Sequence, residues 1–312
     1  MESTLPEAPW AAARHVKSKR LPQVIGHRGY SAAFPENTMA SFRGAIEVGA
    51  TALEADLHLS QDGVVDSTLN RCFGQKKKIS DCSWDHLSTL RTLREPSQPM
   101  PRLVDLLEYL NEPIAEHAWL LLDIKTDDDA GELLTAIAAA ITSVPATKRP
   151  WTERVMLGPW DADWFGKCLR LLPDFPVALI AFSPDYASAM LPVPNLNFNL
   201  YNHSFATSRG SRFIARAQEK HRLLFSWSDN SDEQMSRSIR NEVDGVITDD
   251  PFRFAELCAQ WDVKEVRERA SQSTLKGTIL WVIINVLVIV GEVISYCIGG
   301  SPRSRVSKSI GI

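Results

Sequence analysis

Apolar and polar positions alternate along most of the chain in a way that predicts strands and helices in turn. From Gln23 to about Trp261, short apolar runs typical of buried strands are separated by longer stretches with a helical repeat. The predicted strands are Val24–His27, Ala52–His58, Gly63–Val65, Trp119–Lys125, Arg154–Gly158, Val177–Phe182, Leu196–Leu200, Leu223–Trp227 and Gly245–Thr248. The predicted helices are Met39–Val48, Arg102–Leu110, Gly131–Ile141, Trp164–Leu171, Ser211–Lys220, Glu233–Arg240 and Phe252–Ala259. Thr38 is the expected N-cap of the first helix.

Strands that alternate with helices form parallel βαβ units, which leaves two architectures, a doubly wound open sheet and a closed barrel. About 240 residues with eight or nine strands fit one closed barrel better. No repeat, low-complexity tract or shift in composition divides the region. We therefore expect an α/β protein with a single (β/α)8 TIM barrel over residues 22–261. A polar N-terminal extension over residues 1–21 precedes it.

The chain changes character after the barrel region. A linker of mixed charge (262–276) leads to an apolar segment (277–300) and a basic tail (301–312). Thr278 to Ile298 is long enough, at about 1.5 Å per residue, to cross a hydrocarbon layer of about 30 Å. A buried terminal helix and a shallow insertion are the alternatives, because Glu292 costs about 2.5–3.5 kcal/mol near the centre of a spanning helix. We expect a C-terminal membrane anchor that leaves the barrel in the cytosol.

Charge and cysteine content narrow the class of protein further. A net charge of −4 argues against a general nucleic-acid binder, which normally has a basic excess. The five cysteines include no Cys-x-x-Cys pair, which favours a reducing compartment. The N-terminus has basic residues but no apolar stretch of the kind found in secretory signal peptides.

Charged side chains stand at the ends of several predicted strands, where a barrel of this kind places its functional groups. The first strand ends in His27 and is followed by Arg28. Alternation puts Glu54, Asp56 and His58 of the second strand on one face, and Asp123 and Lys125 of a later strand on another. Three converging carboxylates repel one another unless a cation neutralises them, and oxygen ligands suit Mg²⁺ or Ca²⁺. His27 is suited to proton transfer, and Arg28 and Lys125 to phosphate binding. Taken alone, a His-Arg-Gly sequence is mostly coincidence, and a Glu-x-Asp sequence on a strand more often marks an exposed edge.

The complete set of motifs resembles the glycerophosphodiester phosphodiesterase family. The resemblance covers roughly residues 22–260 and is carried by His27-Arg28-Gly29, Pro35-Glu36-Asn37-Thr38, Glu54-x-Asp56, Asp62-Gly63, Asp123-x-Lys125 and Gly245-Val246-Ile247-Thr248-Asp249-Asp250-Pro251. Asp123, where most members carry Glu, and the apolar tail are most similar to the phosphatidylglycerol phospholipase C branch.

The resemblance implies a (β/α)8 barrel and roles for seven residues. Glu54, Asp56 and Asp123 match the positions that hold a divalent cation, His27 matches the first of two catalytic histidines, and Arg28 and Lys125 match residues near the phosphate. Trp227 matches an aromatic residue on the glycerol side of the substrate, although a plain core tryptophan is the alternative. The implied reaction is metal-dependent hydrolysis of a glycerophosphodiester bond in phosphatidylglycerol, giving diacylglycerol and glycerol phosphate at a membrane surface.

One departure from the family pattern concerns the second histidine. After Asp62-Gly63 the family continues with a strand that ends in His-Asp. Here Asp66 matches the aspartate, Val65 stands in place of the histidine, and the segment is short by about four residues. Three explanations remain open: an incorrectly assembled gene, a catalytically impaired relative that binds lipid or metal, or replacement by another histidine, for which His58 is the nearby choice. A phosphodiesterase acting on soluble glycerophosphodiesters is a further alternative.

Overall fold

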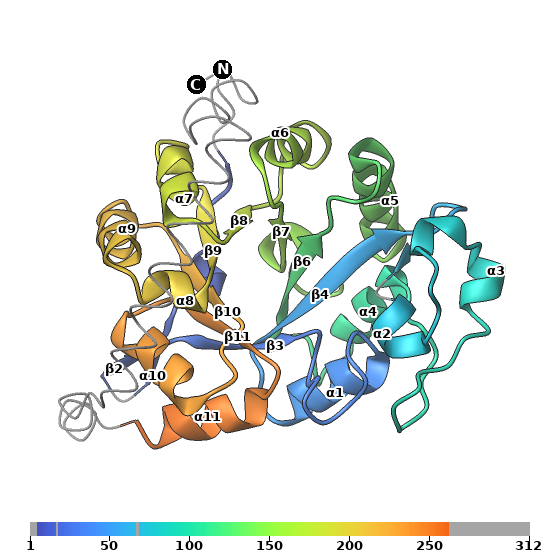
Figure 1. The fold of residues 1–312 in the computed structure, drawn as a ribbon, viewed down its shortest axis with the longest axis horizontal. Coiled ribbons are helices and arrows are strands. Elements are labelled where there is room, and N and C mark those ends of the chain that lie inside the picture. Colours follow the sequence, from blue (N-terminus) through green and yellow to red (C-terminus); the bar gives the residue numbers. More distant parts are fainter. Residues whose placement is uncertain (1–4, 17, 67–68, 262–312) are drawn as a thin grey trace.

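Eight parallel strands form a ring in this computed structural model, which describes residues 5–16, 18–66 and 69–261. In the order in which they pair, the strands are β7 (Val155–Gly158), β6 (Trp119–Ile124), β4 (Ala52–Leu59), β3 (Gln23–His27), β11 (Gly245–Thr248), β10 (Leu224–Trp227), β9 (Asn197–Tyr201) and β8 (Ala178–Ala181). A parallel bridge between Leu157 and Val177 joins the two ends of this order. The predicted barrel is therefore confirmed, and Figure 1 shows helices placed around the ring.

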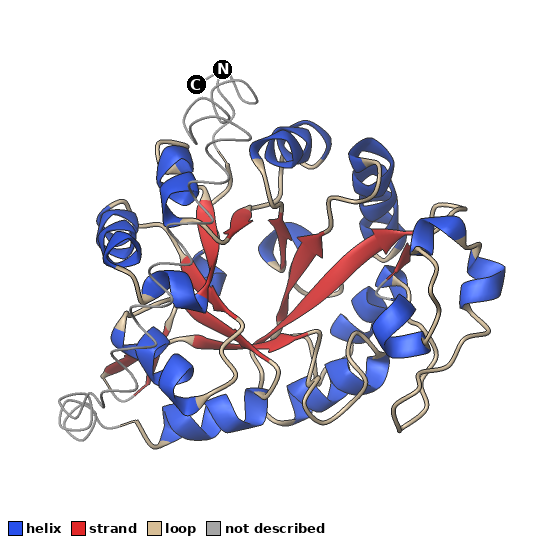
Figure 2. Cartoon of the chain, in the orientation of Figure 1, coloured by secondary structure: helices blue, strands red, loops and turns tan. Residues whose placement is uncertain are grey.

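The helices agree with the predicted pattern and add several short ones (Figure 2). They are α1 (Met39–Glu47), α2 (Leu69–Phe73), α3 (Trp84–Leu87), α4 (Leu103–Leu110), α5 (Ala130–Ser143), α6 (Ala162–Leu171), α7 (Pro184–Met190), α8 (Asn202–Phe205), α9 (Ser208–Glu219), α10 (Asp232–Arg240) and α11 (Pro251–Ala259). Thr38 caps α1 as predicted, because its Oγ1 accepts the Ser41 N–H at 3.3 Å while Ser41 Oγ accepts the Thr38 N–H at 3.2 Å. The predicted helices begin and end within about three residues of the observed ones.

The predicted third strand is the element that differs most. It is reduced to β5 (Val65–Asp66), which pairs antiparallel with the end of β4 instead of joining the ring. The strands of the ring itself all pair in parallel.

Alternation along the strands separates two apolar layers. On β4, Leu53, Ala55 and Leu57 belong to the outer core between strands and helices. The residues between them point into the barrel, where Ala52 joins an inner cluster with Ile25 and Trp119. Because this inner row continues beyond the apolar residues, the strand places charged side chains at the C-terminal mouth of the barrel.

The N-terminal segment, expected from its sequence to be a polar extension, packs against the barrel. Ala8 and Ala11 are buried in the inner cluster, and the ring of Trp10 packs on that of Trp119 with centroids 5.3 Å apart. The side chain of Gln23, at the start of β3, donates to the carbonyls of Trp10 and Ala12 at 2.8 Å. A small antiparallel pair, β1 (Arg14–Val16) with β2 (Lys19–Leu21), leads into β3. The segment therefore closes the N-terminal end of the barrel.

The predicted linker, apolar segment and basic tail (262–312) lie outside the described residues. Within the part of the chain that is described, no helix has the length and apolar character needed to cross a bilayer. The membrane anchor therefore stays a prediction.

Candidate active site

Three buried carboxylates meet at the C-terminal mouth of the barrel. Glu54 and Asp56 lie on the inner row of β4, and Asp56 is the direct neighbour of Asp123 on β6. One oxygen from each of the three lies within 4.8 Å of the others. The exposed fractions are 2%, 2% and 8% respectively, so this is not an exposed strand edge. The structure brings together the three residues that the sequence proposes as cation ligands.

Arg28 and Lys125 lie against these carboxylates. Arg28 Nε is 2.9 Å from one oxygen of Asp56, and Lys125 Nζ is 2.8 Å from the other. Lys125 Nζ also lies 2.5 Å from Asp123. Burial raises the pKa of Asp56, but the charges of Lys125 and Arg28 lower it more, so the pKa falls below its usual range. Burial lowers the pKa of Lys125, and the carboxylates raise it above the ordinary value. Both cations are therefore charged at neutral pH, which suits binding of a phosphate group.

Glu54 has an incomplete set of hydrogen-bond partners. Its Oε2 accepts the Arg28 backbone N–H at 2.9 Å, whereas its buried Oε1 has no hydrogen-bond partner. Burial raises the pKa of Glu54 to about 7. A buried oxygen without a donor, beside two further carboxylates, is the arrangement that a hard divalent cation satisfies. The residues present therefore fit a cation held by Glu54, Asp56 and Asp123.

His27 is oriented by a residue to which the sequence analysis assigned no role. Its Nδ1 lies 2.5 Å from Asp249, which follows β11, and its Nε2 faces Glu54 at 4.0 Å. Burial lowers the pKa of His27, but the hydrogen bond to Asp249 and the charge of Glu54 raise it above the ordinary value. Asp249 stands in the terminal-strand motif that carried the resemblance, yet its contact with His27 joins positions 222 residues apart. Periodicity cannot reveal such a pair.

The remaining motif residues build the loop that presents Arg28. Gly29 has φ = +81°, and a Cβ there would lie 2.5 Å from atoms of Ser41, so the loop packs tightly on α1. Arg28 Nη1 is 3.1 Å from Glu36, and the Asn37 side-chain oxygen accepts the Asp56 backbone N–H at 3.3 Å. The motif residues therefore position Arg28 and Asp56 relative to each other.

Aromatic side chains line the opposite side of the mouth. Trp227, at the end of β10, is half-buried and packs on Trp160, Phe182 and Tyr201 with ring centroids 5.1–5.4 Å away. Trp160 Nε1 donates to Asp123 at 2.7 Å, which joins this aromatic cluster to the carboxylates. Trp227 is thus part of the mouth as well as of a packed cluster.

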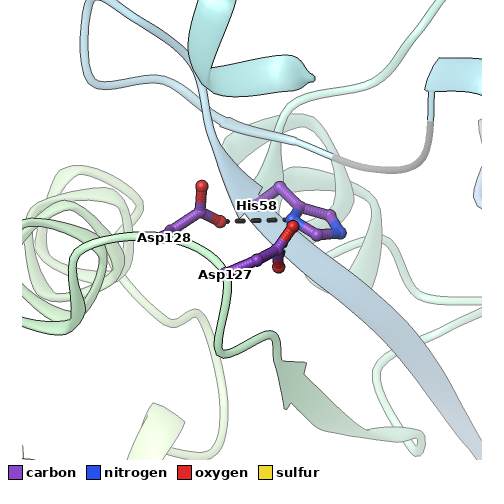
Figure 3. Close-up of side chains that lie close together, drawn as sticks. All are labelled: His58, Asp127 and Asp128. Carbon is purple, nitrogen blue, oxygen red and sulfur yellow. Dashed lines mark hydrogen bonds and ion pairs between the residues drawn. The ribbon is translucent and has the colours of Figure 1, made fainter. Parts of the chain in front are cut away.

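The second histidine of the family pattern has no counterpart on β5. His58, the nearby alternative, lies on β4 two residues beyond Asp56, and Figure 3 shows its ring turned toward Asp127 and Asp128. Its Nδ1 is 3.2 Å from Asp128 and 3.4 Å from Asp127. Within the described part of the chain, His27 is the histidine in ion-pair distance of the three-carboxylate cluster.

A parallel barrel with buried carboxylates, two cations and an oriented histidine at its mouth defines a metal-dependent hydrolase of phosphate esters. Residues 27–253 match the model of the glycerophosphoryl diester phosphodiesterase family, and the chain belongs to that family. Its members are phosphoric diester hydrolases that typically depend on a divalent metal, and this protein is an enzyme of that class.

Individual relatives agree with this assignment. The chain is 24% identical over 247 residues to a protein of Caldanaerobacter subterraneus named glycerophosphodiester phosphodiesterase, which covers 75% of this chain and 96% of the relative. It is 27% identical over 249 residues to the uncharacterized protein YqiK of Bacillus subtilis, covering 75% and 98%.

Two solved structures share the fold. A putative glycerophosphoryl diester phosphodiesterase from Silicibacter pomeroyi has a TM-score of 0.68 and 22% identity, covering 80% of this chain and 95% of that one. A phosphodiesterase from Oleispira antarctica, solved with the product sn-glycerol-3-phosphate, has a TM-score of 0.66 and 17% identity, covering 77% and 97%.

Proposed function

We propose that this protein hydrolyses phosphatidylglycerol at a membrane surface, in lipid metabolism, giving diacylglycerol and glycerol phosphate. The observation that carries the proposal is the mouth itself, where the carboxylate cluster with Arg28 and Lys125 adjoins the aromatic cluster around Trp227. The charged side suits the phosphodiester, and the aromatic side offers apolar area for the rest of a lipid. Asp123 in place of the usual Glu and the apolar segment 277–300 support the choice of a lipid over a soluble diester.

The residues of the mouth divide the chemistry between them. Glu54, Asp56 and Asp123 would hold Mg²⁺ or Ca²⁺, and the bound cation supplies polarisation of a phosphoryl oxygen. Arg28 and Lys125 bring two positive charges to the place where the phosphate binds. Asp249 holds Nδ1 of His27 in a hydrogen bond, so Nε2 is the ring nitrogen that would exchange a proton with the substrate.

Attachment to the membrane would place this mouth beside its substrate. We propose that residues 277–300 anchor the protein C-terminally and leave the barrel in the cytosol. The exposed lysines 76–78 support a membrane-facing mouth, because their charges suit anionic lipid headgroups. They follow Gly74, and the Leu93 side chain, which is 72% exposed, packs beside that glycine and adds an apolar contact at the same place. Arg94 ties the loop of Leu93 to the carbonyls of Ser31 and Ala32 near His27.

The missing second histidine predicts slow turnover. Cleavage requires one proton removed from the attacking oxygen and one delivered to the leaving oxygen, and His27 lies on one side of the carboxylates. Inserting about four residues that end in His before Asp66 should raise the rate of phosphatidylglycerol cleavage by at least about 10²-fold. The same insertion with Ala in place of that His restores the strand length without the proton carrier and is the matched control.

The assay distinguishes the alternative functions. Cleavage of phosphatidylglycerol in vesicles is compared with cleavage of soluble glycerophosphoglycerol for the unmodified, His-inserted and Ala-inserted chains. Faster turnover of the soluble diester by the His-inserted chain would favour the soluble substrate. No cleavage by any of the three, with vesicle or metal binding retained, would favour a non-catalytic binding protein. Equal rates for the unmodified and His-inserted chains would refute the predicted need for a second histidine.

A further inference from the structure

A second group of metal-ligating side chains lies outside the carboxylate cluster. His58 comes from the end of β4, while Asp127 and Asp128 come from the loop between β6 and α5. Figure 3 shows both carboxylates reaching the same edge of the imidazole ring. Nδ1 of His58 lies 3.4 Å from Asp127 and 3.2 Å from Asp128, and ligand atoms of all three fall within 4.8 Å of one another.

The charges of this group are not balanced by the surrounding side chains. Asp128 is nearly buried, with 4% of its side chain exposed. In the described ranges no Lys or Arg forms an ion pair with Asp127 or Asp128, and Lys125 is engaged by Asp56 and Asp123. Nδ1 of an imidazole carries one hydrogen at most, so it can donate to only one of the two carboxylates that face it. The other carboxylate is left facing a nitrogen and a like charge, an arrangement that a cation would stabilise.

The spacing of the ligand atoms suits a small transition metal. Zinc binds imidazole nitrogen and carboxylate oxygen at about 2.0–2.2 Å, so neighbouring ligand atoms at tetrahedral or octahedral angles lie about 3.0–3.5 Å apart. The two distances from Nδ1 fall in that range. The Leu59 backbone N–H donates to Asp128 Oδ2 at 3.2 Å and fixes the orientation of that carboxylate.

We propose that His58, Asp127 and Asp128 form a binding site for a zinc-class divalent ion, separate from the cation site at Glu54. The ligand atoms determine the difference between the two sites. An imidazole nitrogen favours zinc and other borderline transition metals, whereas the all-oxygen set of Glu54, Asp56 and Asp123 favours Mg²⁺ or Ca²⁺. The exposed Asp127, with 55% of its side chain accessible, leaves the site open for solvent ligands and for entry of the ion. This proposal does not depend on the lipid substrate.

The test is a zinc titration of the full-length protein kept saturated with Mg²⁺. Calorimetry gives the stoichiometry, and Co²⁺ absorption in the visible range reports the ligand set. We expect one zinc equivalent in the unmodified protein and its loss in His58→Gln/Asp127→Asn. Asp127→Asn alone, a change in an exposed loop that should not disturb folding, should weaken zinc binding by at least about 10-fold.

Two further variants separate this site from other surface ligands. Asp85→Asn/His86→Gln removes the same pair of residue types from an exposed position on α3 and should keep the zinc equivalent. Glu54→Gln should also keep it, because it alters the other site. Unchanged zinc stoichiometry and affinity in both Asp127 variants would overturn the proposal. His58 and Asp128 would then form only a hydrogen-bonded pair. Loss of the zinc equivalent in Glu54→Gln, with Asp127→Asn unaffected, would overturn it as well.

Discussion

Asp229 provides a test of how burial controls stability in this barrel. The side chain is fully buried and accepts hydrogen bonds from Ser226 at 2.7 Å and from Ser238 at 2.6 Å. Burial raises its pKa to about 6, because the hydrogen bonds only partly offset the lost hydration. Asp229 lies between β10 and α10, and its hydrogen bonds go to residues outside the cation site, so its titration is a property of the core.

The sign of the effect follows from the direction of this change. The folded-state pKa lies above the ordinary value of 3.8, so the native protein binds the proton more tightly than the unfolded chain does. The contribution to the free energy of unfolding is fully present below about pH 4 and is lost as the pH rises through about 6. The difference between 3.8 and about 6 corresponds to about 3 kcal/mol.

Asp229→Asn removes this titration and keeps a side chain of similar shape. Urea unfolding of both proteins, followed by circular dichroism from about pH 4 to pH 7, gives the difference in unfolding free energy. The advantage of the native Asp over Asn should shrink by about 2.5 kcal/mol across that range, because the unfolded-state pKa of 3.8 lies just below its lower end. Asp232→Asn is the control. The hydrogen bond from Arg253 lowers the pKa of Asp232, so the contribution of Asp232 to the free energy of unfolding should be lost as the pH falls, the opposite of Asp229. A stability difference between the native protein and the Asp229→Asn variant that stays constant with pH would refute the reasoning.

Three further predictions concern other parts of the molecule. Asp249→Asn should lower turnover by about 10²-fold or more with little change in KM, because His27 loses the partner that orients it; an unchanged pH–rate profile would contradict this role. Arg154→Met should lower the free energy of unfolding by about 3 kcal/mol, because the fully buried guanidinium donates to the carbonyls of Leu110, Ala115 and Ala118; a loss below about 1 kcal/mol in urea unfolding would contradict it. Truncation after Asp262 should give a soluble protein with a cooperative melting transition, and aggregation of that protein would show that the apolar segment belongs to the core.

Local sequence patterns predicted most of the barrel because strands and helices here follow their periodicity closely. The inner row of β4 placed Glu54 and Asp56 on one face, and register with β6 then brought Asp123 beside them. Capping of α1 by Thr38 was equally local. The short strand predicted at residues 63–65 is found two residues later, as β5, and it pairs antiparallel with β4 outside the ring.

Features that depend on distant contacts could not be predicted in this way. The pairing of His27 with Asp249 joins positions 222 residues apart. The contact of Trp160 with Asp123 joins a side chain just beyond β7 to one near the end of the neighbouring strand β6, and strand periodicity alone does not give it. The segment before β3 looks polar because its buried apolar residues, Leu5, Ala8, Ala11 and Leu21, are few and far apart in the sequence. Its role becomes clear only when Trp10 meets Trp119. The grouping of His58 with Asp128 likewise depends on the path of a loop.

Closure of the barrel base by the N-terminal segment has a consequence for synthesis on the ribosome. The Ala13 N–H binds Asp244, 231 residues later, and β3 pairs with β11, so residues at the start of the barrel need partners that are made more than 200 residues later. Until β11 has emerged, Trp10 and the first strand have no complete surface on which to pack. Contacts of such long sequence separation slow folding and prolong exposure of apolar surface. Nascent chains that stop before residue 244 should therefore keep Trp10 accessible to chaperones, and release of the complete barrel should bury it.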